Sequence, residues 1–133
     1  MKQGPLCLLL VLSILSAPLT FAQEEPPQPV EVTHITGNLH KLYVNGQAAV
    51  ITSIGEDGLL LVDAAYAFTT DAVQEALDKL GAGPAKLIIN THGDADHVGG
   101  NGALGGAARI IAHPTVRAAM SSYYSLPAID VAG

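Results

Sequence analysis

The sequence predicts an α/β domain in which several consecutive strands are followed by strands that alternate with helices. Two observations lead to this prediction. Between residues 30 and 62, short runs rich in β-branched and aromatic residues are separated by turn signals. After residue 63, apolar residues recur with a helical period, and further short apolar runs follow. This succession of elements is typical of a layered α/β architecture.

The composition allows one modest globular domain. The chain has 133 residues, of which 49% are hydrophobic and 14% charged, with a mean hydropathy of +0.35. These values exclude a disordered polar tail and a protein that spans a membrane many times. Six basic residues against twelve acidic ones give a net charge of −6, which offers no positive surface for a phosphate backbone. We therefore expect no nucleic-acid partner.

The first 22 residues have the pattern of a secretory signal peptide. Lys2 supplies a positive start, residues 6–16 an apolar run, and residues 20–22 a small-residue cleavage site. A membrane anchor is the alternative, but the run is interrupted at Pro18 and is shorter than the roughly 20 residues needed to cross a bilayer. We expect cleavage before Gln23 and export to the periplasm or the cell exterior, without a membrane anchor in the mature form.

Export would also remove the only cysteine. Cys7 lies in the apolar run, so the mature chain would have no disulfide and no thiolate to act as ligand or nucleophile. Loss of Lys2 leaves five basic residues against twelve acidic ones, a net charge of −7. Residues 23–29 contain three prolines in seven positions and predict a linker. The folded part, 30–133, is expected to begin near Val30.

Four strands are expected before residue 63. Runs of β-branched and aromatic residues predict three of them, and a continuous apolar run predicts a fourth that is covered on both faces. Asn45-Gly46 is a strong two-residue hairpin turn between the second and the third strand, and Gly55–Gly58 is a second turn. The expected strands are residues 30–35, 39–44, 48–54 and 59–62.

An amphipathic helix is expected next. The apolar residues between Ala72 and Leu80 fall on one helical face, Thr70 or Asp71 can cap the helix, and Gly81 can end it.

Strands and helices then alternate to the end of the chain. Residues 86–89 and 109–112 are apolar runs that predict two further strands. The small residues of 99–108 predict a short helix between them, and Pro114 can open another helix that runs through Tyr123.

Four potential metal ligands, His92, Asp94, Asp96 and His97, lie within six residues directly after the strand at 86–89. In an extended chain, alternating positions share a face and His97 can reach a neighbouring point. The spacing therefore suits one ion, or two ions about 3.5–4 Å apart. Imidazole and carboxylate without sulfur fit zinc, and also manganese or iron. The alternative is a solvated acidic loop with two incidental histidines.

Residues 90–101 resemble the metal-binding signature T-H-x-H-x-D-H-x-G-G-N of the metallo-β-lactamase superfamily. The paired glycines would let the backbone pass close beneath the ligands. The order of the expected elements over 30–133 is also similar to that of the family. The resemblance implies an αβ/βα sandwich of which only the N-terminal half is present. The matching positions are Thr91, His92, Asp96, His97, Gly99, Gly100 and Asn101.

The resemblance also implies roles for the loop residues. His92 would be a ligand of a first metal, and Asp96 and His97 ligands of a second. Asp96 would in addition orient or deprotonate the attacking water, which makes it the candidate catalytic residue. Asp94 departs from the signature, which has histidine there. A carboxylate can still bind zinc, so two consequences stay open: a changed metal preference, or a less acidic metal-bound water.

Further ligands of the family, two histidines and a bridging acidic residue or cysteine, would lie beyond Gly133, so we expect a truncated chain. A catalytic zinc normally has three protein ligands and an open position. The four residues present would hold one ion weakly and could not complete two.

The resemblance predicts a metal-dependent hydrolase with zinc as the expected metal. It would act on a small-molecule substrate and be inactive as this fragment alone. β-Lactams, thioesters, lactones and phosphoesters all stay open as substrates, and the sequence does not indicate an oligomeric state. The alternative is a non-catalytic metal-binding or interaction half-domain, or a degenerate relative.

Other polar residues receive weaker assignments. His113 follows a strand and is expected to be structural or solvent-facing, and His34 and His40 are expected at the surface. Asp63 ends the strand at 59–62. It would either orient a ligand histidine through a hydrogen bond or serve as a turn residue.

Overall fold

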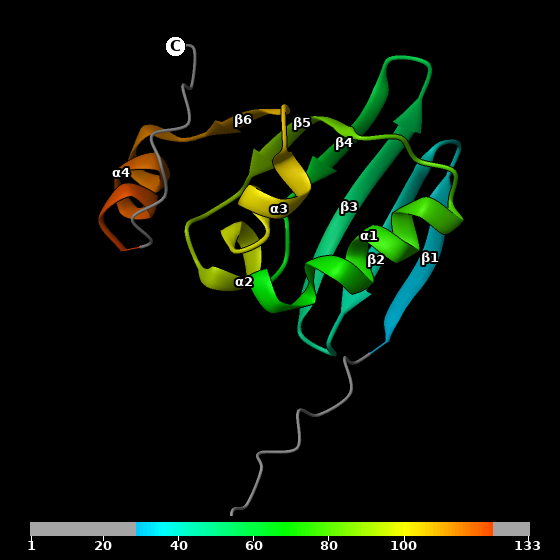
Figure 1. Ribbon diagram of the computed structural model, residues 1–133, viewed down its shortest axis with the longest axis horizontal. Coiled ribbons are helices and arrows are strands. Elements are labelled where there is room, and N and C mark those ends of the chain that lie inside the picture. Colours follow the sequence, from blue (N-terminus) through cyan, green and yellow to red (C-terminus); the bar gives the residue numbers. More distant parts are fainter. Residues whose placement is uncertain (1–28, 124–133) are drawn as a thin grey trace, which may run out of the picture.

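The computed structural model describes residues 29–123, which form a six-stranded mixed sheet with helices on one face (Figure 1). Strand order in the sheet follows chain order. The first four strands are antiparallel neighbours, and the last three are parallel to one another. The strands are β1 Val30–Thr36, β2 Leu39–Val44, β3 Ala48–Gly55, β4 Gly58–Val62, β5 Ala85–Asn90 and β6 Arg109–Ala112.

All six strands lie within about two residues of the predicted positions, which confirms the expected succession of elements. The hairpin between β2 and β3 also forms where Asn45-Gly46 predicts it, with φ angles of 53° and 65°. Its loop is longer than predicted, because Val44 pairs with Ala48 and leaves Gln47 as a third loop residue. The expected signal peptide and all but the last residue of the linker lie outside the described residues and stay predictions.

The amphipathic helix is α1, Thr70–Lys79, whose buried side packs towards β1 and β2. Gly81 follows with a φ of 73°, as expected of a residue that ends a helix. The predicted cap is wrong. Thr70 and Asp71 are already helical, because a 3-10 turn, η1 (Ala67–Thr69), continues directly into the helix. The Thr70 hydroxyl therefore donates to a carbonyl of that turn instead of capping the helix.

Three further helices follow β5. The short helix expected between β5 and β6 is α3, Asn101–Gly105, and Pro114 opens α4, Pro114–Tyr123, as predicted. One helical turn was not expected: α2, Ala95–Val98, lies within the segment that carries the candidate ligands. Within 29–123, no helix combines the length and the apolar character needed to cross a bilayer.

The core lies between the sheet and the helices that cover it in Figure 1. Leu42, Val50 and Ile88 of the sheet and Val73 and Leu77 of α1 are fully or almost fully buried, and burying each such side chain contributes about 1.5–3 kcal/mol.

The prediction that β4 is covered on both faces is wrong. Leu59 and Leu61 are buried, whereas Leu60 and Val62, which alternate with them, are only half-buried. Successive side chains of a strand point to opposite faces, and the helices cover only one of the two.

Two polar side chains on the covered face of the sheet, His40 and Thr52, have buried atoms without hydrogen-bond partners. His40, expected at the surface, is only half exposed, and its Nδ1 atom is buried without a hydrogen-bond partner. Its neighbour on β3, Thr52, is fully buried and its hydroxyl also lacks a partner. The reason is register, since both residues stand in line with the core residues Leu42 and Val50 on their strands. His34 is exposed, as predicted.

Thr52→Val should raise the free energy of unfolding by about 1 kcal/mol, because it removes a buried hydroxyl without a partner and keeps the shape of the side chain. Urea unfolding in the presence of a chelator measures this. Thr33→Val on the exposed strand β1 is the matched control and should change stability by less than about 0.5 kcal/mol. A loss of stability in Thr52→Val would show that the hydroxyl is bonded in solution.

Candidate metal centre

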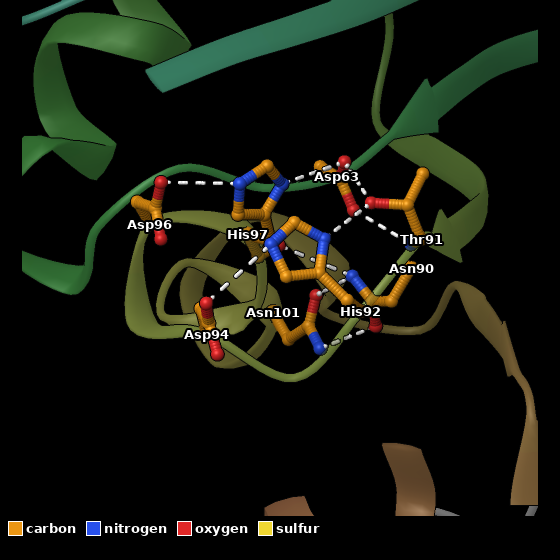
Figure 2. A network of polar contacts seen from close by, with 8 residues as sticks. All are labelled: Asp63, Asn90, Thr91, His92, Asp94, Asp96, His97 and Asn101. Carbon is orange, nitrogen blue, oxygen red and sulfur yellow. Dashed lines mark hydrogen bonds and ion pairs between the residues drawn. The ribbon is translucent and has the colours of Figure 1, made fainter. Parts of the chain in front are cut away.

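The candidate ligands gather at the carboxyl ends of β4 and β5 (Figure 2). These strands are parallel neighbours, so the segments that leave them start at the same edge of the sheet. Asp63 comes directly after β4, and Thr91 and His92 come directly after β5. Side chains that are about thirty positions apart in the chain are thereby brought into contact.

Asp63 is the buried centre of this group, with only 4% of its surface exposed. The Thr91 backbone N–H donates to its Oδ1 atom at 2.8 Å, and the Thr91 hydroxyl donates to Oδ2 at 2.7 Å. Nδ1 of His97 lies 2.8 Å from the same Oδ2. This confirms that Asp63 orients a predicted ligand histidine. Its φ of 65° is in the left-handed region, but the backbone forms no turn or bend there, so the turn-residue alternative is not confirmed.

These hydrogen bonds fix the tautomers of both imidazoles. A carboxylate only accepts, so His97 carries its proton on Nδ1. The Thr91 hydroxyl donates its hydrogen bond to Asp63 and therefore accepts from Nδ1 of His92 at 2.9 Å. In both neutral rings the lone pair then lies on Nε2. Metal-binding histidines are held in this way, with the other ring nitrogen donating to an anchored acceptor.

Three of the four predicted ligands form one compact group. His92, Asp96 and His97 each offer a ligand atom, and these atoms lie within 4.8 Å of one another. The two ring centroids are 3.6 Å apart. Nε2 of His97 lies 3.1 Å from Oδ2 of Asp96, which brings two acceptors face to face. A second proton on His97 or a cation between the two atoms relieves that contact, and the donor set of two imidazoles and one carboxylate fits zinc.

Asp94 lies outside this group. Its side chain is 79% exposed, and its Oδ2 atom is 3.7 Å from Nε2 of His92. The expectation that positions 92, 94 and 96 share a face of an extended chain is wrong. The chain turns into α2 directly after Asp94, whose carbonyl accepts from the backbone N–H of His97 and of Val98. The role of Asp94 as a ligand stays a prediction.

The charge around the group favours a cation. Asp63, Asp94 and Asp96 surround the two imidazoles. Among the ion pairs of residues 29–123, the acidic side chains of this group pair with histidine and not with Lys or Arg. A cluster of acidic side chains without basic partners attracts positive ions.

A buried pair of amides, which sequence reasoning missed, supports the loop from below. The side chains of Asn90 and Asn101 donate to each other at 3.1 and 2.8 Å, and both are buried. Asn90 also donates to the carbonyl of His97 at 3.2 Å. The pair joins the end of β5, the start of α3 and the backbone of a candidate ligand. Asn101 belongs to the signature, but only the fold reveals its partner.

The paired glycines allow the close passage that the sequence predicts. A Cβ atom on Gly100 would overlap the carbonyl of Ala64, and one on Gly99 would overlap the carbonyl of Ala95. The Gly100 N–H donates to the carbonyl of Ala65 at 3.0 Å. The ligand loop is thus fastened to the segment that follows β4.

His113 is exposed, which agrees with the expected structural or solvent-facing role. It is outside the ligand group, and its Nδ1 atom lies 2.7 Å from the Thr115 hydroxyl at the start of α4.

Comparison with known proteins agrees with this geometry. A sequence profile described as the metallo-beta-lactamase superfamily matches residues 44–125. The chain belongs to this superfamily. Metallo-beta-lactamase domain-containing protein 1 of Rattus norvegicus is 40% identical over 58 residues, which are 42% of this chain and 23% of that protein.

Solved metallo-β-lactamases share the fold. The HARLDQ-motif enzyme of Cronobacter sakazakii has a TM-score of 0.66 at 23% identity, over 72% of this chain and 38% of its own. BJP-1, a subclass B3 metallo-β-lactamase of Bradyrhizobium japonicum, has a TM-score of 0.56 at 29% identity, over 68% and 35%. The predicted fold class is confirmed for the part of the domain that is present. The chain spans less than two fifths of the length of these relatives.

Asp63→Asn should weaken metal binding about 10–100-fold, because the amide no longer holds the His97 ring through a charged acceptor. Competition with a chromophoric chelator measures the affinity, and circular dichroism checks the fold. Asp57→Asn, in the exposed turn between β3 and β4, is the control for loss of one negative charge. Equal losses in the two variants would mean that charge alone, and not orientation, determines affinity.

Asn101→Ala should lower the free energy of unfolding by about 2 kcal/mol, because it leaves the buried amide of Asn90 partly unpaired. Urea unfolding of the metal-free protein gives the value. Asn38→Ala removes an exposed side-chain hydrogen bond and should cost less than about 0.5 kcal/mol. Equal stability of the two variants would contradict a supporting role for the buried pair.

Proposed function

We propose that this superfamily member is part of a metal-dependent hydrolase that activates water at His92, Asp96 and His97. One observation carries the proposal. The hydrogen bonds centred on Asp63 leave the lone pairs of both imidazoles on Nε2, within one group that includes the Asp96 carboxylate. The chemistry of these donors supports zinc as the ion, with manganese and iron as the alternatives.

The three residues of the group would have different roles in the proposed reaction. A bound ion would polarise a substrate carbonyl and lower the pKa of water towards neutrality. His92 and His97 would bind the ion. The carboxylate of Asp96, which is partly exposed, would also contact the ion and would orient a water or accept its proton. The side chain of His92 is 47% exposed, which leaves room for a small molecule to approach.

The proposal for the whole protein extends beyond this chain. Three protein ligands and one open position make a catalytic zinc site, and the rest of the protein would add ligands for a second ion and shape the pocket. We propose a small-molecule substrate with an ester-like or amide-like centre, and no nucleic acid, since the chain is acidic. Export to the periplasm or the cell exterior is part of the proposal.

A second candidate is a non-catalytic metal-binding half-domain. The uncovered face of the sheet favours it, because that face carries apolar side chains that are only half-buried, and Ile111 is 43% exposed. A metal-loaded whole protein that hydrolyses none of the ester, thioester, lactone and β-lactam probes would support this candidate over a hydrolase.

Loss of a ligand should empty the centre. We expect the full chain to bind zinc, and His92→Ala, Asp96→Ala and His97→Ala each to weaken binding at least about tenfold. Asp94→Ala should lose less, because Asp94 lies outside the compact group. Equilibrium dialysis with elemental analysis gives the affinities. Equal metal content in all variants would remove this loop as the metal centre.

A further inference from the structure

Two other histidines face each other on the covered side of the sheet, on strands that lie away from the candidate centre. His34 of β1 and His40 of β2 are directly opposite in register. Their ring centroids are 5.1 Å apart and the rings are tilted by 52°. Thr52 of β3 is directly opposite His40. Residues that pair in this way point to the same face, so the three side chains form a row across three strands.

A backbone carbonyl fixes the tautomer of the first ring. Nε2 of His34 lies 3.0 Å from the carbonyl oxygen of Gly37. That oxygen only accepts, so Nε2 of His34 carries the proton and Nδ1 has the lone pair. Imidazoles that bind metals are held in the same way, by an N–H bond to a fixed acceptor.

The other two members of the row each have a buried polar atom without a partner. Nδ1 of His40 and the hydroxyl of Thr52 are the two buried side-chain polar atoms within residues 29–123 that no protein group satisfies. Buried polar atoms nearly always have a partner, and these two belong to one pair of the β2–β3 ladder. A partner that both can share is therefore expected between the strands.

The ligand atoms of His34, His40 and Thr52 favour a transition-metal ion as the shared partner. Calcium and magnesium prefer oxygen ligands and carboxylates, whereas this row offers two imidazoles and one hydroxyl. Imidazole suits divalent copper, nickel and zinc, with copper bound most tightly. His34 is exposed, so water can complete the coordination on its side.

We propose that His34 and His40, with the Thr52 hydroxyl beside them, form a second site for a divalent transition-metal ion. It is independent of the proposed hydrolase centre, since it shares no residue with His92, Asp96 or His97.

Copper binding to the tag-free 133-residue chain tests the site. In the His92→Ala/His97→Ala double variant, which lacks the first centre, Cu²⁺ should still bind at one site per chain. Its electron paramagnetic resonance spectrum should show coupling to nitrogen. Adding His34→Gln or His40→Gln should weaken this binding at least about tenfold. Adding His113→Gln, which removes a histidine at the start of α4, should leave it unchanged.

The outcomes separate the two sites. Copper affinity that is the same with and without His34 and His40 overturns the second site. A spectrum without nitrogen coupling overturns it as well. Either result is expected if a water molecule, and not a metal ion, bridges His40 and Thr52. Should His40→Gln fail to fold in urea unfolding with chelator, the exposed His34→Gln decides alone. The copper experiment stays decisive even if no metal binds at His92, Asp96 and His97, because it uses the His92→Ala/His97→Ala double variant, which already lacks that centre.

Discussion

The hydrogen bonds to one buried carboxylate determine the geometry of the candidate centre. Asp63 accepts from the backbone and the side chain of Thr91 and from the ring of His97. Through the Thr91 hydroxyl it also sets the tautomer of His92. A buried carboxylate needs such partners, since burial of an unpaired charge is strongly unfavourable. The same bonds that satisfy Asp63 therefore prepare both imidazoles for a cation.

Asp63 follows β4, the strand at which the sheet changes from antiparallel to parallel pairing. β3 and β4 are antiparallel neighbours, whereas β4, β5 and β6 are parallel. The ends of β4 and β5 consequently lie side by side, and the loops that leave them can share hydrogen bonds. The close contact of Gly100 with Ala64 and the amide pair of Asn90 and Asn101 then hold the ligand loop against the segment after β4.

Helices pack on only one face of the sheet. This agrees with the finding that the chain spans only part of the length of its solved relatives. Helices cover one face, where Leu61 and Ile88 are fully buried, while Leu60 and Ile89 on the other face are half-buried. The chain spans 35–38% of the length of the solved relatives compared above. Catalysis is therefore proposed for the whole protein, whereas the orientation of the ligands is complete within this part.

The sequence by itself determined the strands, the helices α1, α3 and α4, and three members of the ligand group. The hairpin at Asn45-Gly46 and the helical period of α1 are local patterns, and the resemblance of residues 90–101 to a known signature identified His92, Asp96 and His97.

Tertiary structure decided which groups meet. The partners of Asp63 lie 28 and 34 positions away, and the parallel pairing of β4 and β5 brings the segments that carry them together. It also turned Asp94 out of the group, left one face of β4 uncovered and buried Nδ1 of His40. The physical reason is range: propensity and periodicity act over a few neighbours, whereas a hydrogen bond between distant residues exists only once the sheet has set their positions.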